Sequence, residues 1–365
     1  MRITRISATT VRVPRPQPFT SSLGRTQDSE NAVVQIHTDQ EIVGIGEASS
    51  IWDRKGTGET EFINGLLGPA LIGKDPFRVA EISALMDGLA HRSYPAKAGI
   101  EMALHDIVGK ALDTPVYNLL GGLVRERVRL SHSLSMGRSE QVAEQAAALA
   151  AEGYKTLKLK VGQDPRSDRE NLAAIRGRVG DDFTLRVDAN MGWATAKDAV
   201  RHIRDLETFG LELVEQPLPP ADPEGLRFVR EHVDVPTMAD ESVWSASDAM
   251  ACARAQSFDV FNVYVSEAGG LGPAAHIFAI AEAARIPCII GSMPELGVGT
   301  AAQAHLAFAM RNLGYGSDVN GCVYHSDDVI REELPIEDGY IHPPPGPGLG
   351  VSLDPDKVAQ YRTGP

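Results

Sequence analysis

The chain has 365 residues, 43% of them hydrophobic, which is enough for one large core with a smaller domain or for two cores of similar size. The formal net charge of -14, without a basic cluster, argues against nucleic acid or an anionic membrane as a partner and leaves a small-molecule substrate. The three cysteines suit reduced thiols, no segment approaches a bilayer span, and the N-terminus resembles a strand and not a signal peptide, so we expect a cytoplasmic protein.

The first 125 residues have the pattern of a small α+β unit. Alternating apolar residues over 1–13 and in a hairpin over 31–47 predict an antiparallel sheet. Asp75-Pro76 predicts a helix start, and apolar residues at spacings of three and four predict a second helix over 100–111.

Short apolar strands then alternate with helices over residues 126–325. Units of roughly 25 to 30 residues indicate a parallel barrel, with a doubly wound sheet as the alternative. Strands are expected over 128–133, 156–161, 183–188, 213–215, 237–240, 260–264, 288–291 and 314–318. Residues 326–365 are too rich in proline and glycine for a barrel element, and we expect them to pack back on the first domain.

Polar residues end or closely follow most of these strands. The carboxyl ends of barrel strands meet at one face, where active sites lie. A single acid at a strand end is more often a helix cap or a solvated loop residue, but a run of such positions is harder to explain in that way. In chain order the residues are Lys158, Lys160, Asp188, Glu215, Asp240, Tyr264, Glu295 and Asp318.

Three of these residues predict a metal site. Asp188, Glu215 and Asp240 are each one barrel unit apart, which places them on adjacent strands. Clustered carboxylates repel one another unless a cation joins them, and hard oxygen ligands suit Mg²⁺. Glu241 is the neighbour of Asp240, and the pattern alone does not decide which of the two faces the metal.

Lys158 and Lys160 lie two apart in an apolar strand, so both side chains point to the same face. Burying two ammonium groups side by side is costly unless an anion or a developing negative charge is near. Lys158 alone could instead be a lysine that extends its ammonium group to solvent.

Seven short motifs together resemble the enolase superfamily, and within it the muconate-lactonizing-enzyme subgroup. They are spread over nearly the whole chain. The motifs are Gly46-Glu47-Ala48, Lys158-x-Lys160, Val187-Asp188-Ala189-Asn190, Val214-Glu215-Gln216-Pro217, Ala239-Asp240-Glu241-Ser242, Gly269-Gly270 and Pro347-Gly348-Leu349-Gly350.

The resemblance implies an α/β fold with a capping domain over a modified TIM barrel, (β/α)7β, and one Mg²⁺, with Mn²⁺ as a substitute. It assigns the metal to Asp188, Glu215 and Asp240. The family's shared step removes a proton next to a carboxylate, giving an enediolate that the metal stabilises. Homo-oligomers are common in the family, so one is expected here as well.

The resemblance also implies roles for the residues around the metal. Lys160 would be the base, with its pKa lowered by the cation and by Lys158, while Lys158 would stay charged and polarise the substrate carboxylate. Asn190 would orient the ligands or the lysines.

The sequence departs from the subgroup at Tyr264, where relatives carry a second lysine at the end of the sixth strand. A lysine there could act as a second base for racemisation. Tyrosine, with an ordinary pKa near 10, is a poor base at neutral pH but a competent acid. The substitution therefore favours anti β-elimination of water, although Tyr264 could also be a packing residue.

Clues to the substrate are fewer. In the family, loops of the capping domain cover the barrel mouth, which points to Ser22 and Trp52 as substrate contacts, although Trp52 could equally have a packing role. Glu295 and Asp318 add negative charge, which would suit a substrate with an ammonium group beside its carboxylate.

The leading hypothesis is dehydration of an amino acid resembling cis-3-hydroxy-L-proline, since the family contains dehydratases and epimerases of that type. The nearest alternative is an epimerase or racemase of a proline-betaine, N-acyl amino acid or dipeptide. A non-catalytic metal-binding protein is the alternative of another class. A cycloisomerase of an unsaturated diacid is also possible, but acidic residues at the rim, Glu295 and Asp318, would repel a second carboxylate.

Overall fold

The N-terminal part of the chain forms a three-stranded antiparallel sheet. The structure, a computed structural model, describes residues 1–52 and 54–364, and its first sheet has the order β1 (Ile3–Ser21), β2 (Gly24–Thr38), β3 (Val43–Ala48). Pairing of β2 with β3 confirms the hairpin predicted over 31–47. β1 and β2 are longer than predicted, and their tip reaches the barrel, where Ser22 Oγ lies 2.9 Å from the carbonyl oxygen of Ala189.

Helices pack against this sheet. α4 (Tyr94–Ala111) lies on β2 and β3 and confirms the second predicted helix, with an earlier start. The start predicted at Asp75-Pro76 is wrong: Asp75 Oδ1 accepts the amide of Phe77 (3.1 Å) and caps a separate turn, so α3 (Val79–Leu89) begins later. The shorter segments are α1 (Gly56–Phe62), η1 (Ile63–Leu67), α2 (Gly68–Leu71) and α5 (Val116–Leu119).

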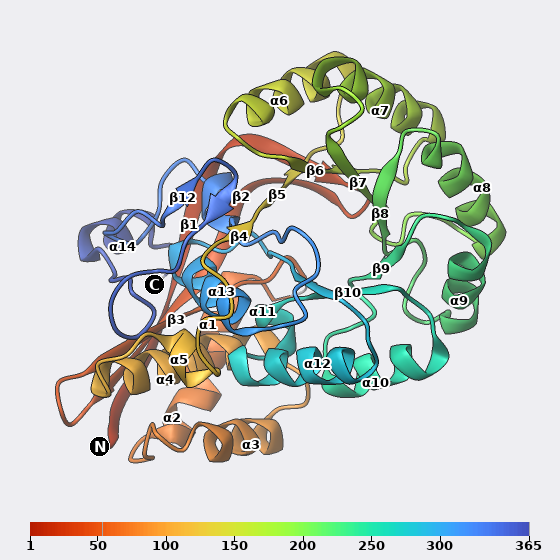
Figure 1. Ribbon diagram of the computed structural model, residues 1–365. Coiled ribbons are helices and arrows are strands. Elements are labelled where there is room, and N and C mark those ends of the chain that lie inside the picture. Colours follow the sequence, from red (N-terminus) through yellow and green to blue (C-terminus); the bar gives the residue numbers. More distant parts are fainter. Residues whose placement is uncertain (53, 365) are drawn as a thin grey trace.

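Seven parallel strands form a curled sheet in the order β11-β10-β9-β8-β7-β6-β5 (Figure 1). They are β5 (Ser131–Leu134), β6 (Thr156–Lys160), β7 (Thr184–Asp188), β8 (Leu211–Glu215), β9 (Thr237–Ala239), β10 (Val260–Val263) and β11 (Cys288–Ile290). The helices between and after them are α6 (Ser139–Ala151), α7 (Pro165–Val179), α8 (Ala196–Glu207), α9 (Pro223–His232), α10 (Ala246–Ala255), α11 (Val265–Ala268), α12 (Leu271–Ala283) and α13 (Gly297–Ala309). Strands adjacent in space are consecutive in sequence, as in a barrel and unlike a doubly wound sheet.

The eighth strand predicted over 314–318 is not a regular strand. Instead, Ser317 makes backbone hydrogen bonds of 2.9 Å with Ser131 and Arg129 on one side, and the Asp318 amide donates to Ile290 (2.8 Å) on the other. Its pairing with Leu130 is a single isolated bridge at Ser317 and not a continuous ladder. These bonds nevertheless close the gap between β11 and β5.

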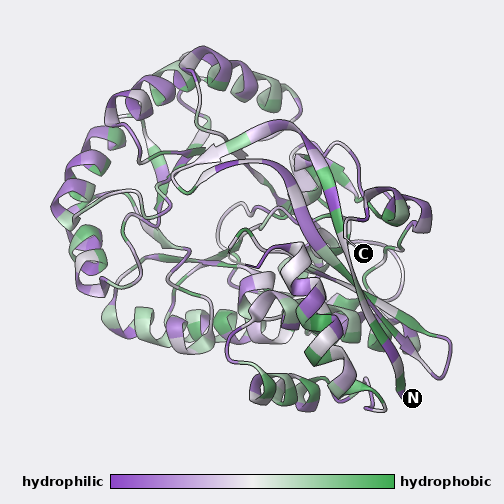
Figure 2. Ribbon diagram, turned by 180° about the vertical axis from the view of Figure 1, so that it is seen from behind, coloured by the Kyte–Doolittle hydropathy of each residue, from purple (hydrophilic) through white to green (hydrophobic). Residues whose placement is uncertain are grey.

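The largest core lies between the strands and the outer helices. Leu157 and Leu159 of β6 and Leu172 of α7 are almost fully buried in it. Because strand side chains alternate, Lys158 and Lys160 point to the opposite face, into the barrel. The outer helices show both purple and green turns, as expected of helices with one buried face (Figure 2).

The C-terminal segment returns to the first sheet. α14 (Pro355–Tyr361) packs on β1, and Val358 and Tyr361 contact a small core that contains Val11 and Val13. Nearer the barrel, β12 (Ile336–Glu337) and β13 (Tyr340–Ile341) form a sheet with β4 (Val128–Arg129), and η2 (Gly321–Tyr324) precedes them. In the described part of the chain, no helix has the length and apolar character needed to cross a membrane.

Two buried glutamates of the N-terminal unit bind the starts of barrel helices. Glu47 on β3 accepts the amides of Leu296 and Gly299, both at 2.8 Å, at the start of α13. Glu101 on α4 accepts the first two amides of α12 at 2.7 and 2.9 Å. Such amides lack partners within their own helix and attract negative charge, so these contacts hold the first unit against the barrel.

Replacing Glu47 by alanine is expected to lower the free energy of unfolding by about 2–4 kcal/mol, since two buried helix amides would lose their acceptor. Asn31 Nδ2 (2.8 Å) and Ser49 Oγ (2.7 Å) would lose theirs as well. Urea unfolding measures the change, with the exposed Glu61→Ala as the matched control. A loss below about 0.5 kcal/mol would contradict this role for Glu47.

Candidate active site

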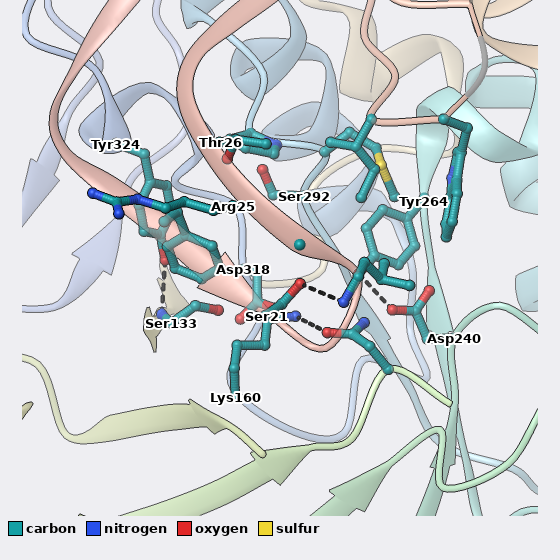
Figure 3. Close-up of a pocket in the computed structure, with 18 of the residues that line it drawn as sticks. Ser21, Arg25, Thr26, Ser133, Lys160, Asp240, Tyr264, Ser292, Asp318 and Tyr324 are labelled. Atoms are coloured by element: carbon teal, nitrogen blue, oxygen red, sulfur yellow. Dashed lines mark hydrogen bonds between the residues drawn. The ribbon is translucent and has the colours of Figure 1, made fainter. Parts of the chain in front are cut away.

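Five consecutive strands end in ionisable side chains that gather at one place. Lys160, Asp188 and Glu215 are the last residues of β6, β7 and β8, and Asp240 and Tyr264 directly follow β9 and β10. Because these strands are neighbours, the three carboxylates lie side by side, with Lys160 on one flank and Tyr264 on the other. Figure 3 shows Lys160, Asp240 and Tyr264 of this group.

The three carboxylates fit a divalent cation. Asp188, Glu215 and Asp240 are buried, and one oxygen from each lies within 4.8 Å of the others. Burial, followed by the charge of Glu241 and Glu215, raises the pKa of Asp240 well above its ordinary value, so negative charge here lacks compensation. Hard oxygen donors in such a group suit Mg²⁺, and Mn²⁺ takes the same ligand type.

The two lysines bind different carboxylates. Lys160 Nζ donates to Asp188, whereas Lys158 Nζ lies between Asp318 (2.6 Å) and Glu215 (2.9 Å). Burial opposes the charge of Lys158, but these two carboxylates outweigh burial and hold its pKa well above the ordinary value. Burial also opposes the charge of Lys160, but the charge of Asp188 outweighs burial and raises the pKa of Lys160. The lowered pKa predicted for Lys160 as a base therefore requires a cation that neutralises Asp188.

Tyr264 lies on the opposite flank of the carboxylates. Its hydroxyl donates to Asp240 Oδ2 (3.0 Å) and lies 3.3 Å from Asn262 Nδ2. Burial and then the charge of Asp240 raise the pKa of Tyr264 well above 10. A phenol in this state can donate a proton but does not act as a base at neutral pH.

Asn190 connects Lys160 to a fourth carboxylate. Its Oδ1 accepts from Lys160 Nζ (2.9 Å), and its Nδ2 donates to Glu241 Oε1 (3.1 Å). Since the amide has one donor and one acceptor end, Glu241 sets its orientation and turns Oδ1 toward Lys160. Where the sequence pattern leaves Asp240 and Glu241 open, the structure places Asp240 in the carboxylate group and Glu241 on Asn190.

Two family models match most of the sequence. Residues 5–121 match the mandelate racemase / muconate lactonizing enzyme N-terminal domain, and residues 141–357 match the enolase C-terminal domain-like family. The chain belongs to the enolase superfamily. Its similarity to muconate-cycloisomerase sequences and structures places it in the muconate-lactonizing-enzyme subgroup, which confirms the resemblance carried by the motifs.

Relatives cover the whole chain. N-succinyl-L-Arg/Lys racemase from Bacillus cereus is 32% identical over 99% of this chain and 98% of its own length. Chloromuconate cycloisomerase from Cupriavidus necator is 36% identical over 99% of both chains. The crystal structure of a dipeptide epimerase from Enterococcus faecalis, complexed with Mg and the dipeptide L-Leu-L-Tyr, has a TM-score of 0.92 and 34% identity, and covers 96% of this chain and 100% of that one. This superfamily member is therefore an enzyme of the Mg²⁺-dependent, proton-abstracting type.

A cavity of about 540 Å³ opens onto the site of this enolase-superfamily enzyme (Figure 3). Of the predicted substrate contacts, Trp52 and Asp318 line it, and Trp52 is held by a hydrogen bond from its Nε1 to Glu267 (2.6 Å). Ser22 and Glu295 are not among the residues that line it; Glu295 accepts instead from Ser292 Oγ (2.5 Å). Negative charge around the cavity is thus smaller than the sequence suggests.

Several cavity residues were not predicted from the sequence. Tyr324 of η2 lines the cavity, and its hydroxyl accepts the amide of Ser133 (2.7 Å). Arg15 and Arg25 reach it from the β1–β2 hairpin. None of the three follows a barrel strand, so the strand-end pattern that identifies Asp188 does not identify them.

Proposed function

We propose that this enzyme removes the α-proton of an amino-acid carboxylate and eliminates water from the β-carbon. The observation that carries the proposal is the pairing of one base with one acid across the carboxylates. Lys160 can take a proton on one face of a bound substrate, and Tyr264 can supply one on the other. Epimerisation by two bases would need a basic group where Tyr264 stands.

Each side chain has a defined part in this reaction. Bound Mg²⁺ supplies stabilisation of the negative charge that develops on the substrate carboxylate. Lys158, held charged by Asp318 and Glu215, adds positive charge at the same group. Lys160 takes the α-proton, the C–H electron pair becomes the new C=C bond, and the β-carbon–oxygen bond breaks as Tyr264 protonates the departing oxygen, which leaves as water. Lys160 then releases its proton to solvent and Tyr264 regains one, so both residues return to their starting state.

An amino acid of the cis-3-hydroxyproline type is the simplest substrate for this geometry. Its α-hydrogen and hydroxyl lie on opposite faces of the ring, in line with Lys160 and Tyr264 on opposite flanks. The resulting enamine converts to an imine without further help from the protein. The negative charge predicted to bind the substrate's ammonium group is smaller than the sequence suggests, because Asp318 is paired with Lys158 and Glu295 does not line the cavity.

Isomerisation is the second candidate, because the relatives include a racemase, epimerases and cycloisomerases. An epimerase would need Tyr264 or another group to return a proton on the face opposite Lys160. A cycloisomerase needs only one acid–base residue at the α-carbon. Of the two acids expected to repel a diacid, Glu295 does not line the cavity and Asp318 is paired with Lys158.

Tyr264→Phe is expected to separate proton removal from elimination. With Mg²⁺ and cis-3-hydroxy-L-proline in D₂O, the variant should still exchange the α-proton, while formation of imine or keto acid falls by about 10²- to 10⁴-fold, since the leaving oxygen loses its acid. NMR measures both processes in one sample.

Tyr361→Phe, which removes a hydroxyl on α14 bonded to Asp327 (2.8 Å), is the matched control and should match the wild type. Elimination at the wild-type rate in Tyr264→Phe would remove Tyr264 from the acid role. Inverted, deuterated substrate without loss of water in the wild type would favour the epimerase.

A further inference from the structure

Arg186 is a fully buried cation in the barrel interior that the proposed reaction does not use. It lies in the middle of β7, and because its neighbours Leu185 and Val187 pack in the outer core, its side chain points inward. Its Cα is paired with that of Lys158 on β6, so two cations stand side by side on neighbouring strands. Like charges in such a pair repel, and each therefore needs a carboxylate of its own.

The Arg186 side chain reaches from β7 to segment 314–318. Its Nη1 donates to the carbonyl oxygen of Gly316 (2.8 Å), and its guanidinium carbon lies 5.8 Å from the centre of the Tyr315 ring. Its Nε donates to Glu212 of β8 (2.6 Å). Glu212 thus balances the charge of Arg186, while the other end of the guanidinium group binds the segment.

Segment 314–318 is held at separate points and not by a continuous ladder. Ser317 forms an isolated bridge to the residue before β5, and the Asp318 amide donates to β11 (2.8 Å). A backbone held in this way depends more on side-chain contacts than a regular strand does. The bond from Arg186 to Gly316 is such a contact, two residues before Asp318.

The same segment carries the carboxylate that binds Lys158. Asp318 Oδ2 accepts from Lys158 Nζ at 2.6 Å, and Glu215 lies 2.9 Å from the same nitrogen. Asp318 and Lys158 are both almost fully buried, so bulk water does not replace either partner if the segment shifts. A chain of contacts therefore runs from Arg186 through Gly316 and Asp318 to Lys158.

Stability alone is a poor reason to bury an arginine here. The attraction within a buried ion pair seldom exceeds the cost of removing both charges from water, and apolar residues of similar volume are often as stable. Another part of the barrel interior is filled in that way, by a cluster that contains Leu213, Met238 and Ile289. Arg186 in place of such a residue points to a role in positioning.

We propose that Arg186 is a positioning residue for Lys158, which it holds at the active site by fixing Gly316 and Asp318. The effect on catalysis rests on the proposed function, because it requires that Lys158 assist removal of the α-proton. The effect on the Lys158 ammonium group itself does not depend on any reaction.

Hydrogen exchange of the Lys158 ammonium group tests the contact without a substrate. NMR of the ¹⁵N-labelled enzyme with Mg²⁺ should show slowly exchanging Nζ protons, assigned by their loss in Lys158→Met. Arg186→Met removes both hydrogen bonds of Arg186 but keeps a long side chain. In this variant the Nζ protons should exchange with water about tenfold faster or more, as expected when a charge-assisted hydrogen bond is lost.

Arg230→Met is the matched control. Arg230 of α9 also binds one carboxylate, that of Asp259 (2.6 Å), and one backbone carbonyl, that of Gln256 (3.3 Å), so its replacement removes the same kinds of contact. Exchange of the Lys158 Nζ protons should stay at the wild-type rate in this variant.

A double-substitution cycle tests the route to catalysis. With Mg²⁺ and cis-3-hydroxy-L-proline in D₂O, Arg186→Met and Asp318→Asn should each slow α-proton exchange by about tenfold or more. The combined variant should be no more than about twofold slower than Asp318→Asn, since substitutions within one chain of contacts are not additive. Thermal unfolding checks that each variant is folded. If Arg186→Met does not fold, Arg186→Lys replaces it, because one nitrogen cannot occupy the positions of both Nε and Nη1.

Four results would overturn the proposal: Nζ protons that already exchange freely in the wild type, unchanged exchange in the Arg186 variant, an equal change in Arg230→Met, or fully additive effects of the Arg186 and Asp318 substitutions. Faster Nζ exchange in Arg186→Met, together with no α-proton exchange on any substrate in the wild type, would instead reject the proposed reaction and leave Arg186 as the residue that holds Lys158.

Discussion

Replacing Lys160 by alanine is expected to slow α-proton exchange by about 10²- to 10⁴-fold, the usual contribution of a general base. Lys158 cannot take over, because Asp318 and Glu215 hold it in the charged form. Mg²⁺ affinity should stay the same or rise, since the ammonium group that competes for Asp188 is gone. Exchange followed by NMR in D₂O and Mg²⁺ binding followed by calorimetry measure the two effects separately.

Two further variants identify the cause of the loss. Lys160→Arg keeps a cation beside Asp188 but offers no usable base, so it should be as slow as the alanine variant. Lys155→Ala removes an exposed lysine just before β6 and should leave exchange intact. Exchange at the wild-type rate in Lys160→Ala would assign the base to another residue, and a parallel loss of Mg²⁺ binding would point to damage at the metal site.

Residues fixed by strand periodicity were predictable from the sequence. The alternation that buries Leu157 and Leu159 turns Lys158 and Lys160 inward, and the repeat of one barrel unit brings Asp188, Glu215 and Asp240 together. The first effect follows from the alternation of side chains along a strand and the second from the order of parallel strands, so neither depends on how the side chains pack.

Features that depend on packing between distant segments were not predictable. Segment 314–318 joins the barrel through a single isolated bridge between Ser317 and Leu130, which no local pattern reveals. Arg15 and Arg25 are placed by a hairpin that crosses from one unit to the other. Glu295 follows a strand as predicted, yet its carboxylate, which accepts from Ser292 and from the Met293 amide, does not line the cavity.

Packing between distant segments also changes the charge that the cavity presents to a substrate. From the sequence, Glu295 and Asp318 predict negative charge and a cationic substrate group. In the structure, Lys158 pairs with Asp318, while the first unit contributes positive charge through Arg25. The sign of the charge facing a substrate is therefore set by the contact between the two units, and Glu47 and Glu101 help to fix that contact.

Replacing Asp240 by asparagine is expected to lower Mg²⁺ affinity by about 10²-fold or more and to abolish α-proton exchange, since one of the three carboxylates proposed to bind the metal is lost. Unfolding midpoints with and without Mg²⁺ measure this. At 100 times its Kd, Mg²⁺ should stabilise the wild type by about 2.7 kcal/mol and the variant hardly at all. Asp234→Asn, an exposed position before β9, is the matched control. Equal stabilisation of wild type and Asp240→Asn by Mg²⁺ would exclude Asp240 as a ligand.

The metal-free form of Asp240→Asn should be as stable as the metal-free wild type or more stable. In the wild type, Asp240 shares a buried site with Glu215 and Glu241, and removing one of these charges relieves their repulsion. A weaker hydrogen bond opposes this gain. The Tyr264 hydroxyl donates to the Asp240 carboxylate in the wild type, and asparagine offers it only a neutral acceptor. A fall in stability in EDTA would show that the lost hydrogen bond outweighs the relief of repulsion, and it would contradict this expectation. A rise would mean that the enzyme keeps this carboxylate group at a cost to its own stability, and that the cation offsets the cost.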